Sequence, residues 1–258
     1  MAEENPWRAV NLEEGMEMDR QIGLLFFRVE MEYGELWIGY RYVEEEEAST
    51  GGANVSAPAD DDLEWVRWSF SNPPEKLELQ PYLPDKPMVV HSEYSQHILP
   101  GDEARIFIGI PATVRFNLQR KKEQHLLELS SEPLSRTWFG DRLEGELCYW
   151  WSTRARRYMP EMNKTQHRIG CPVTIKNSSD EELNFEKFSH RVTRLHIYRY
   201  NGGLWTDETQ ISYLGEEDMS EVIARGRLPK ELQGAEKVTS PRDDAQRSFI
   251  SRTFLGLV

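Results

Sequence analysis

The chain has 258 residues, of which 38% are hydrophobic and 11% are aromatic. This length allows one large all-β domain or two smaller ones, and an apolar content made of few, large side chains favours strands over helices. The formal net charge is −13, and residues 1–62 carry nearly all of it, with 16 acids and 4 bases, whereas residues 63–258 hold 28 acids and 27 bases. Because phosphate binding needs a basic surplus, a nucleic-acid partner is disfavoured. We expect the acidic segment to keep the chain soluble in preference to docking on a basic protein.

The chain begins without the basic and apolar regions of a signal peptide. Its longest strongly apolar run, Ile22 to Phe27, falls far short of the ~20 residues of a membrane helix. We therefore expect a soluble, cytoplasmic protein that does not insert into a membrane. Two cysteines, Cys148 and Cys171, fit that compartment, because a secreted domain of this size more often carries several pairs. We expect both to be reduced thiols in the core.

Residues 22–43 predict a β-hairpin around Tyr33-Gly34, because the first half is apolar and the second half alternates apolar and polar side chains. Residues 44–62 contain almost no large apolar side chain and have acidic blocks at both ends, which indicates an acidic flexible loop. The strand pattern then returns, with turn signals between the segments. The expected strands lie within residues 63–70, 77–83, 88–99, 104–110, 113–118 and 125–130.

The stretch from Leu134 to Trp151 combines three of the eight tryptophans with several charged side chains. In a strand from Glu146 to Thr153, apolar side chains fall on both faces, which indicates a central strand buried on both sides after a short Gly-Asp turn. The alternative is a sugar site, in which aromatic faces stack on the ring and two carboxylates act as acid and base or nucleophile. We favour the central strand, which leaves the turn as the part able to meet a ligand.

Residues 171–188 predict two strands around an Asn-Ser-Ser-Asp turn, and residues 191–214 predict a hairpin with Asn201-Gly202 at its tip. The segment Ser220–Arg225 permits one short helix that stops at Gly226. Apolar residues return near the C-terminus, and we expect this tail to dock on the body as a final strand in preference to tethering a partner protein. They are Phe249, Ile250, Phe254, Leu255 and Leu257.

Strands at close spacing with turns between them, and no sustained helical period, predict an all-β fold. The expected architecture is an antiparallel β-sandwich, with two packed sandwich units and little helix. We place the N-terminal sandwich unit at residues 1–165, including the acidic flexible loop at 44–62, and a C-terminal sandwich-like unit at 166–215. Residues 216–258 are then a C-terminal extension with the short helix and the apolar tail.

Five segments occur in an order that resembles the archaeal and bacterial proteins grouped as domain of unknown function 432. The segments are PYLPDKPMVV, LPGDEARIFIGIP, LSRTWFGDRLEGELCYWWSTRARR, CPVTIKNSSDEELNFEKF and LHIYRYNGGLW. The resemblance spans roughly residues 7–255 and is most specific from Thr137 to Arg157. It implies no catalytic residue. It does imply an association with small-conductance mechanosensitive channels, so an accessory role beside such a membrane channel is one expectation.

The residues best suited to meet a ligand lie in the central stretch and just after it. An exposed tryptophan can stack on a ring, carboxylates can exchange protons, and the guanidinium fork suits carboxylate or phosphate. The speculative ligand-binding set is Trp138, Asp141, Arg142, Glu144, Arg154, Arg156 and Arg157. The more conservative interpretation is that these arginines neutralise acidic side chains of the same chain.

The sequence predicts no metal site, no cofactor and no catalytic residue. Its six histidines are scattered without a recognised metal spacing, and the glycine loops of nucleotide-binding proteins are absent. Cys148 with His167 makes only a weak nucleophile pair, because the cysteine lies in the middle of a strand. These observations lean against an enzyme.

We therefore expect a non-catalytic β-sandwich protein that acts by binding another protein or by self-association, as an interaction or accessory module. The alternative from a different class is a carbohydrate-binding or glycoside-cleaving protein that uses Trp138, Trp150 and the nearby carboxylates.

Overall fold

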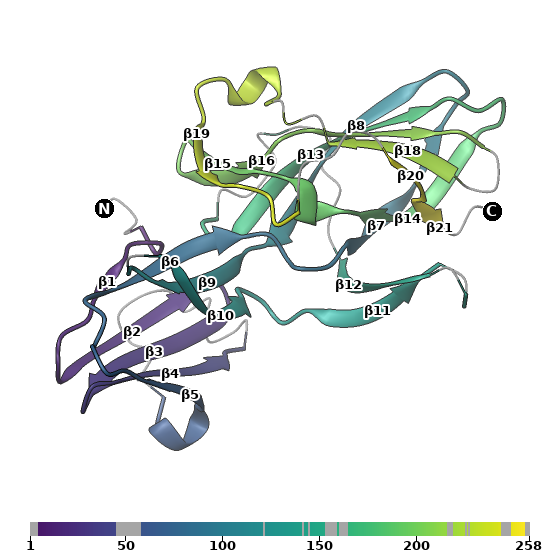
Figure 1. The fold of residues 1–258 in the computed structure, drawn as a ribbon. Coiled ribbons are helices and arrows are strands. Elements are labelled where there is room, and N and C mark those ends of the chain that lie inside the picture. The colour runs from purple at the N-terminus through teal and green to yellow at the C-terminus, as the bar shows by residue number, and fades with distance from the viewer. Residues whose placement is uncertain are drawn as a thin grey trace. The chain divides into compact units, whose positions relative to one another are not determined.

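The computed structural model of the chain describes residues 5–44, 58–120, 122–140, 142–143, 145–152, 159, 165–215, 219–224, 226, 228–243 and 249–255 (Figure 1). The fold is all-β, as predicted. The described residues contain no α-helix, and their helical elements are short 3₁₀ turns. These turns are η1 (Asp60–Asp62), η3 (Val192–Arg194) and η5 (Lys230–Leu232).

The chain forms two compact units that interleave along the sequence. Unit 1 comprises residues 1–82 and 112–133, and unit 2 comprises residues 83–111 and 134–258. The chain therefore passes between the units after residues 82, 111 and 133. The boundaries expected at residues 165 and 215 do not coincide with this division.

Unit 1 is a sandwich of two four-stranded antiparallel sheets. One sheet has the order β1 (Val10–Asn11), β6 (Lys76–Tyr82), β9 (Thr113–Leu118) and β10 (Gln124–Ser130). The other has the order β2 (Met16–Ile22), β3 (Leu25–Glu32), β4 (Glu35–Tyr42) and β5 (Glu64–Ser69). The rings of Phe27 and Phe116, one from each sheet, meet edge to face with centroids 5.1 Å apart, so apolar side chains fill the space between the sheets.

The first hairpin forms where the sequence predicts it. Tyr33 and Gly34 have φ values of 53° and 72°, the positive angles that a tight turn between twisted strands requires. The turn sets the register that opposes Val29 and Ile38, both fully buried on the inner face. On the outer face of the same strand pair, Arg28 donates to both carboxylate oxygens of Asp19 at 2.7 and 2.9 Å.

Unit 2 contains a five-stranded and an eight-stranded sheet. The smaller has the order β11 (Ser135–Phe139), β12 (Glu146–Ser152), β7 (Met88–Ile98), β14 (Leu183–His190) and β21 (Phe254–Leu255). The larger has the order β19 (Glu236–Thr239), β15 (Ile197–Tyr200), β16 (Gly203–Thr206), β13 (Arg168–Asn177), β17 (Thr209–Tyr213), β18 (Met219–Ala224) and β20 (Phe249–Arg252), with β8 (Glu103–Pro111) paired to β13.

Aromatic side chains from both sheets form the centre of unit 2. Phe254 of β21 lies 4.7 Å from Phe185 and 6.3 Å from Phe188 between ring centroids. Tyr213 of the larger sheet meets Phe254 edge to face at 5.8 Å. The prediction that the apolar C-terminal tail docks as a final strand is therefore confirmed for β20 and β21, while Leu257 lies outside the described residues.

The short helix predicted from Ser220 to Arg225 is wrong. Residues Met219–Ala224 form strand β18, which pairs with β17 on one side and β20 on the other. Ser220 and Val222 are buried on one face, opposite Tyr213 and Ile211 of β17. Burial between two strands outweighs the weak local helix preference of this segment.

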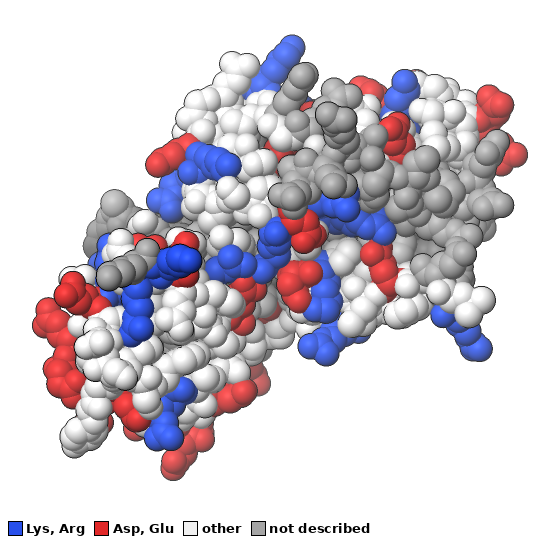
Figure 2. All heavy atoms as spheres, in the orientation of Figure 1, with Lys and Arg blue, Asp and Glu red and all other residues white. Residues whose placement is uncertain are grey.

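The acidic N-terminal segment contributes an acidic surface to unit 1. Figure 2 shows Asp and Glu side chains gathered where Figure 1 places β2 to β5. Residues 45–57 of the predicted flexible loop lie outside the described residues. The end of that loop is tied to the sheet, because Arg28 donates to Asp60 Oδ1 at 2.6 Å.

Candidate functional site

The central stretch of the sequence forms an antiparallel hairpin at one edge of the five-stranded sheet (Figure 1). Strand β11 is the outermost strand, and β12 lies between it and β7. The register places Trp138 directly opposite Leu147 and Thr137 directly opposite Cys148. Since opposed residues of an antiparallel pair share a face, the two pairs lie on opposite faces of the hairpin.

One face of the hairpin is anchored in a small core. Phe139, Cys148 and Val89 of β7 pack together as buried neighbours. Burial, with the nearby charge of Glu146, raises the pKa of the Cys148 thiol to about 11. The thiol is therefore protonated at neutral pH, which removes it as a ready nucleophile.

The other face presents apolar side chains to solvent. Trp138 is 54% exposed and its cross-strand partner Leu147 is 42% exposed. Leu143, in the turn between the strands, is 95% exposed. Large exposed apolar side chains close together mark interaction surfaces more often than single ones do.

The predicted strand near residues 146–153 is present, but the prediction that it is buried on both faces is wrong. Leu147 is exposed on one face, and Trp150 is 43% exposed on the other. The reason is position in the sheet, because only the edge strand β11 covers β12 on its outer side. Alternation in a sequence shows which side chains share a face, but not how far the neighbouring layer extends.

Two polar contacts fix β12 against the rest of unit 2. Arg191 donates from Nη2 to Glu146 Oε1 at 2.6 Å. Tyr149 donates from its hydroxyl to Asp85 Oδ1 at 2.9 Å. Burial alone would raise the pKa of Asp85, but hydrogen bonds from Lys86 and Tyr149 outweigh it and lower that pKa below its ordinary value. No local pattern could have predicted these two contacts, because Arg191 and Asp85 lie far from β12 in the sequence.

The predicted ligand-binding residues have different outcomes. Trp138 is exposed on β11, and Arg142 is exposed in the turn that follows it. The other members of the predicted set lie outside the described residues, so the set stays a prediction. They are Asp141, Glu144, Arg154, Arg156 and Arg157.

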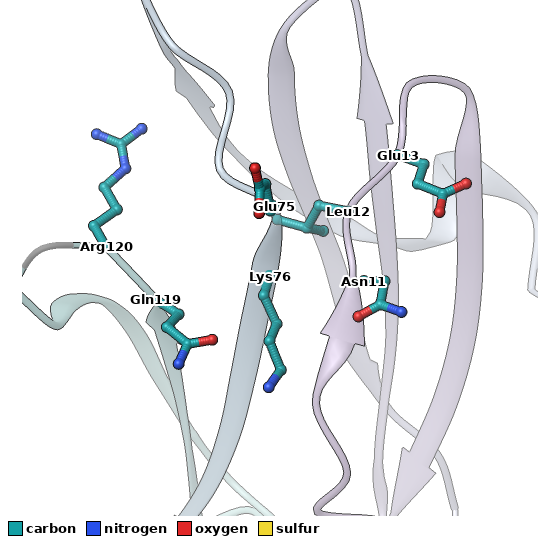
Figure 3. A pocket seen from close by; sticks show the side chains of 7 residues that line it. All are labelled: Asn11, Leu12, Glu13, Glu75, Lys76, Gln119 and Arg120. Atoms are coloured by element: carbon teal, nitrogen blue, oxygen red, sulfur yellow. The ribbon is translucent and has the colours of Figure 1, made fainter.

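A hollow of about 580 Å³ in unit 1 is a second candidate, which the sequence did not indicate (Figure 3). It is lined by Asn11, Leu12, Glu13, Glu75, Lys76, Gln119 and Arg120. Backbone bonds from Leu12 to Glu75 and from Gln119 to Lys76 bring its three chain segments together. Because these segments are far apart in sequence, no local pattern could have revealed the hollow.

The side chains of the hollow carry both charges. In Figure 3, Lys76 stands between Gln119 and Asn11, and the ends of these three side chains point to the same side. Arg120 extends the other way, donates to the Asn72 carbonyl at 2.8 Å and lies 4.8 Å above the Phe70 ring. A second hollow of about 640 Å³ shares Glu75, Gln119 and Arg120 with the first. The mixture of charges favours no single ligand class.

The remaining side chains that could carry chemistry in the described part of the chain include Cys148, Cys171 and Asp207, which are buried within the fold. No group of three or more His, Cys, Asp or Glu residues there is arranged to hold a metal ion. Cys171, like Cys148, is a buried free thiol, as predicted for both. Burial raises the pKa of Asp207, which accepts the His196 backbone N–H at 2.8 Å and joins the open ends of the β15–β16 hairpin.

These features define an all-β protein of two sandwich units with an exposed apolar hairpin at a sheet edge. No helix among the residues that the structure describes is long and apolar enough to cross a membrane. The chain belongs to the family of proteins of unknown function DUF432, which matches residues 6–258, and this confirms the resemblance found in the sequence. Searches of curated proteins and of solved structures found no match.

Proposed function

We propose that the protein acts by binding another protein, without catalysing a reaction, and that the β11–β12 hairpin makes the contact. The observation that carries this proposal is the exposed pair of Trp138 and Leu147, directly opposite each other next to the sheet edge. Exposing such side chains costs solvation free energy, and a partner that covers them recovers it.

The composition of the hairpin supports a protein partner. Tryptophan and arginine are enriched among the residues that dominate binding energy at protein interfaces. Trp138 is flanked by exposed Arg136 on its own strand, and Arg142 is exposed in the turn. An apolar centre with cationic side chains at its rim is the usual anatomy of a specific interface.

The groups around the hairpin support binding in preference to catalysis. The Cys148 thiol is buried with a raised pKa. The carboxylate of Glu146 is held by Arg191 and by the Ser189 hydroxyl at 3.4 Å. Side chains committed in this way hold the strand in place and are poorly available to a substrate.

A carbohydrate ligand remains the second candidate, because Trp138 and Trp150 are both exposed. They lie on opposite faces of the hairpin, so they cannot stack on one sugar together. A glycan array with the native chain and with Trp138→Ala and Trp150→Ala variants tests this candidate. Binding of a glycan that either variant loses would favour it over a protein partner.

The protein-binding proposal is tested by capturing partners with the immobilised full chain from soluble and detergent-solubilised cell fractions. The test variant is Trp138→Ala with Leu147→Ser. The control is Leu99→Ser with Leu214→Ser, because these side chains are 58% and 39% exposed in the same unit. Circular dichroism checks that both variants are folded.

We expect specific proteins that the native chain and the control retain and the hairpin variant loses. If the hairpin variant retains the same proteins as the native chain, the hairpin is not the binding surface. A membrane channel among the lost proteins would support the accessory role expected from the family resemblance, and loss of only soluble proteins would argue against it.

A further inference from the structure

We propose that the partner is a second copy of this chain, and that two copies join by antiparallel pairing of their β11 strands about a two-fold axis at Thr137. This inference rests on the proposed function, because it names the protein that covers the hairpin. It would extend the five-stranded sheet of one copy into that of the other by β-strand addition.

The edge of β11 is open to such pairing. Among the described residues β11 pairs with β12 only, so one side of its backbone faces away from the sheet. Its sequence, SRTWF, has no lysine, proline or glycine, and its register to β12 is uninterrupted. Lysine, proline and register-shifting bulges are devices with which proteins ordinarily block an exposed edge; β11 lacks all three, and Arg136 is its one charged side chain.

Four other edge strands show such protection, whereas β2 and β5, the edges of the second sheet of unit 1, have uninterrupted registers. Strands β1 and β21 are two residues long, which leaves little edge to extend. The pairings of β10 and β19 contain register shifts. Among the edge strands whose side chains the structure describes, β11 alone combines an uninterrupted register with a large exposed aromatic side chain.

The sequence of β11 selects the register. With the axis at Thr137, Arg136 of each copy lies opposite Trp138 of the other, and Ser135 lies opposite Phe139. With the axis at Arg136, two guanidinium groups would oppose each other, which is unfavourable. With the axis at Trp138, the arginine would face Gly140 and the contact between Arg136 and the indole would be lost.

The fold already contains the side-chain pair that this register requires. Trp37 of β4 and Arg67 of β5 are directly opposite in an antiparallel pair. The guanidinium carbon of Arg67 lies 5.0 Å from the centroid of the Trp37 ring. An arginine and a tryptophan facing each other across antiparallel strands therefore reach cation–π distance, and two-fold symmetry would form this contact twice.

The charge of the strand also permits self-pairing. The chain carries a formal charge of −13, which opposes association of two copies at long range. No carboxylate lies on β11 itself, so pairing brings none together within the strands. At physiological ionic strength, charges more than about 8 Å apart are largely screened.

The first test is sedimentation of the full chain over concentrations from about 1 to 200 μM, the range in which weak to moderate dimers dissociate. We expect a monomer–dimer equilibrium whose dissociation constant rises at least tenfold in Trp138→Ala and does not change in Leu99→Ala. A chain that is monomeric throughout overturns the inference, and so does a dimer that is indifferent to Trp138→Ala.

The second test fixes the register with single cysteines. Arg136→Cys, Thr137→Cys and Trp138→Cys are each oxidised in a Cys148→Ala background, because Cys148 lies directly opposite Thr137 in the same chain and would compete for it. Residues that meet on a two-fold axis approach within disulfide distance. We expect a covalent dimer with Thr137→Cys only. Dimers from either of the other variants instead would overturn the proposed axis.

The experiments distinguish failure of self-pairing from failure of the proposed binding function. If the chain is monomeric but captures a foreign protein through Trp138, self-pairing is overturned and the proposed binding function stands. If it neither dimerises nor loses a captured protein on Trp138→Ala with Leu147→Ser, both are overturned.

Discussion

His190 lies beside the aromatic core of unit 2 as a buried histidine. It is 1% exposed, and neither ring nitrogen has a hydrogen-bond partner among the residues that the structure describes. The Phe188 ring lies beside it, with centroids 6.4 Å apart. Burial lowers the pKa of His190 from its ordinary value of 6.5 to about 4, because a charged imidazole is poorly solvated there.

Because of this lowered pKa, we expect His190 to make the folded chain less stable in acid. The unfolded chain binds the proton more tightly than the folded one, so stability is retained above pH 6.5 and falls as the pH drops toward 4. His190→Phe removes the titrating group. We expect the variant to be at least as stable at pH 7 and to lose about 3 kcal/mol less than the native chain on going to pH 4.

Urea unfolding at several pH values between 7 and 4 measures this difference, with exposed His125→Gln as the control. Equal pH slopes in the native chain and His190→Phe would show that other groups cause the acid sensitivity.

Position 170 requires glycine, because the Trp205 ring lies too close to leave room for a Cβ atom. Gly170 of β13 is the register partner of Trp205 in β16, and an added Cβ would lie 2.5 Å from the indole. Gly170→Ala should therefore lower the free energy of unfolding by about 1–3 kcal/mol, as overpacking does. Adding Trp205→Leu should reduce that penalty, because it removes the clashing ring. Urea unfolding followed by circular dichroism compares the four chains of this cycle, and additive effects would contradict the proposed clash.

At the level of single elements, local signals in the sequence predicted much of the fold. Tyr33-Gly34 and Asn201-Gly202 adopt positive φ in the structure and close the two hairpins that were predicted there. A tight turn depends on the residues within it, so it can be predicted without knowledge of the rest of the chain. Alternation of apolar and polar side chains is also a local signal, and it predicted the position of most strands.

Elements whose structure depends on distant partners were harder to predict. Strand β18 is defined by its pairing with β17 and β20, and the local sequence alone permitted a helix. At the candidate site, alternation correctly placed Cys148 and Leu147 on opposite faces of β12. It could not show that the sheet ends one strand further on, which is why Leu147 and Trp150 are exposed.

We expect the terminal strand β21 to contribute much to stability, although it is only two residues long. Phe254 is fully buried against Phe185, Phe188 and Tyr213. Phe254→Ala should cost about 3–5 kcal/mol, and Phe254→Leu should cost less because it leaves a smaller cavity. Denaturant unfolding measures both, with half-exposed Leu214→Ala as a control expected to stay within about 0.5 kcal/mol of the native chain. A Phe254→Ala variant as stable as that control would mean that the tail contributes little.

At the scale of the whole molecule, the sandwich architecture followed from the spacing of strands, but the membership of each unit did not. Residues 83–111 lie between two segments of unit 1 and belong to unit 2. Strand β8 pairs with β13 from Glu103 to Pro111, a contact between segments that are far apart in sequence. Local patterns carry no information about such pairing, so a boundary at residue 165 was the natural inference from composition and turns.

This interleaving predicts which pieces of the chain fold alone. Tyr82 of β6 and Thr113 of β9 are directly opposed in an antiparallel pair. A two-residue Asn-Gly turn can therefore join them in place of residues 83–112. We expect the shortened chain, residues 1–82 joined to 113–133, to keep both sheets of unit 1 and to unfold cooperatively.

The fragment 1–165 is the matched comparison, because it ends at the boundary that the sequence suggested. It retains β7 and β8 but lacks β13 and β14, their principal partners in unit 2. The unpaired edges and apolar faces of these strands should make its 83–111 segment sensitive to proteases and the fragment prone to aggregation. Limited proteolysis with circular dichroism decides between the two divisions, because a fully protected 1–165 fragment beside an unfolded shortened chain would place the boundary at 165.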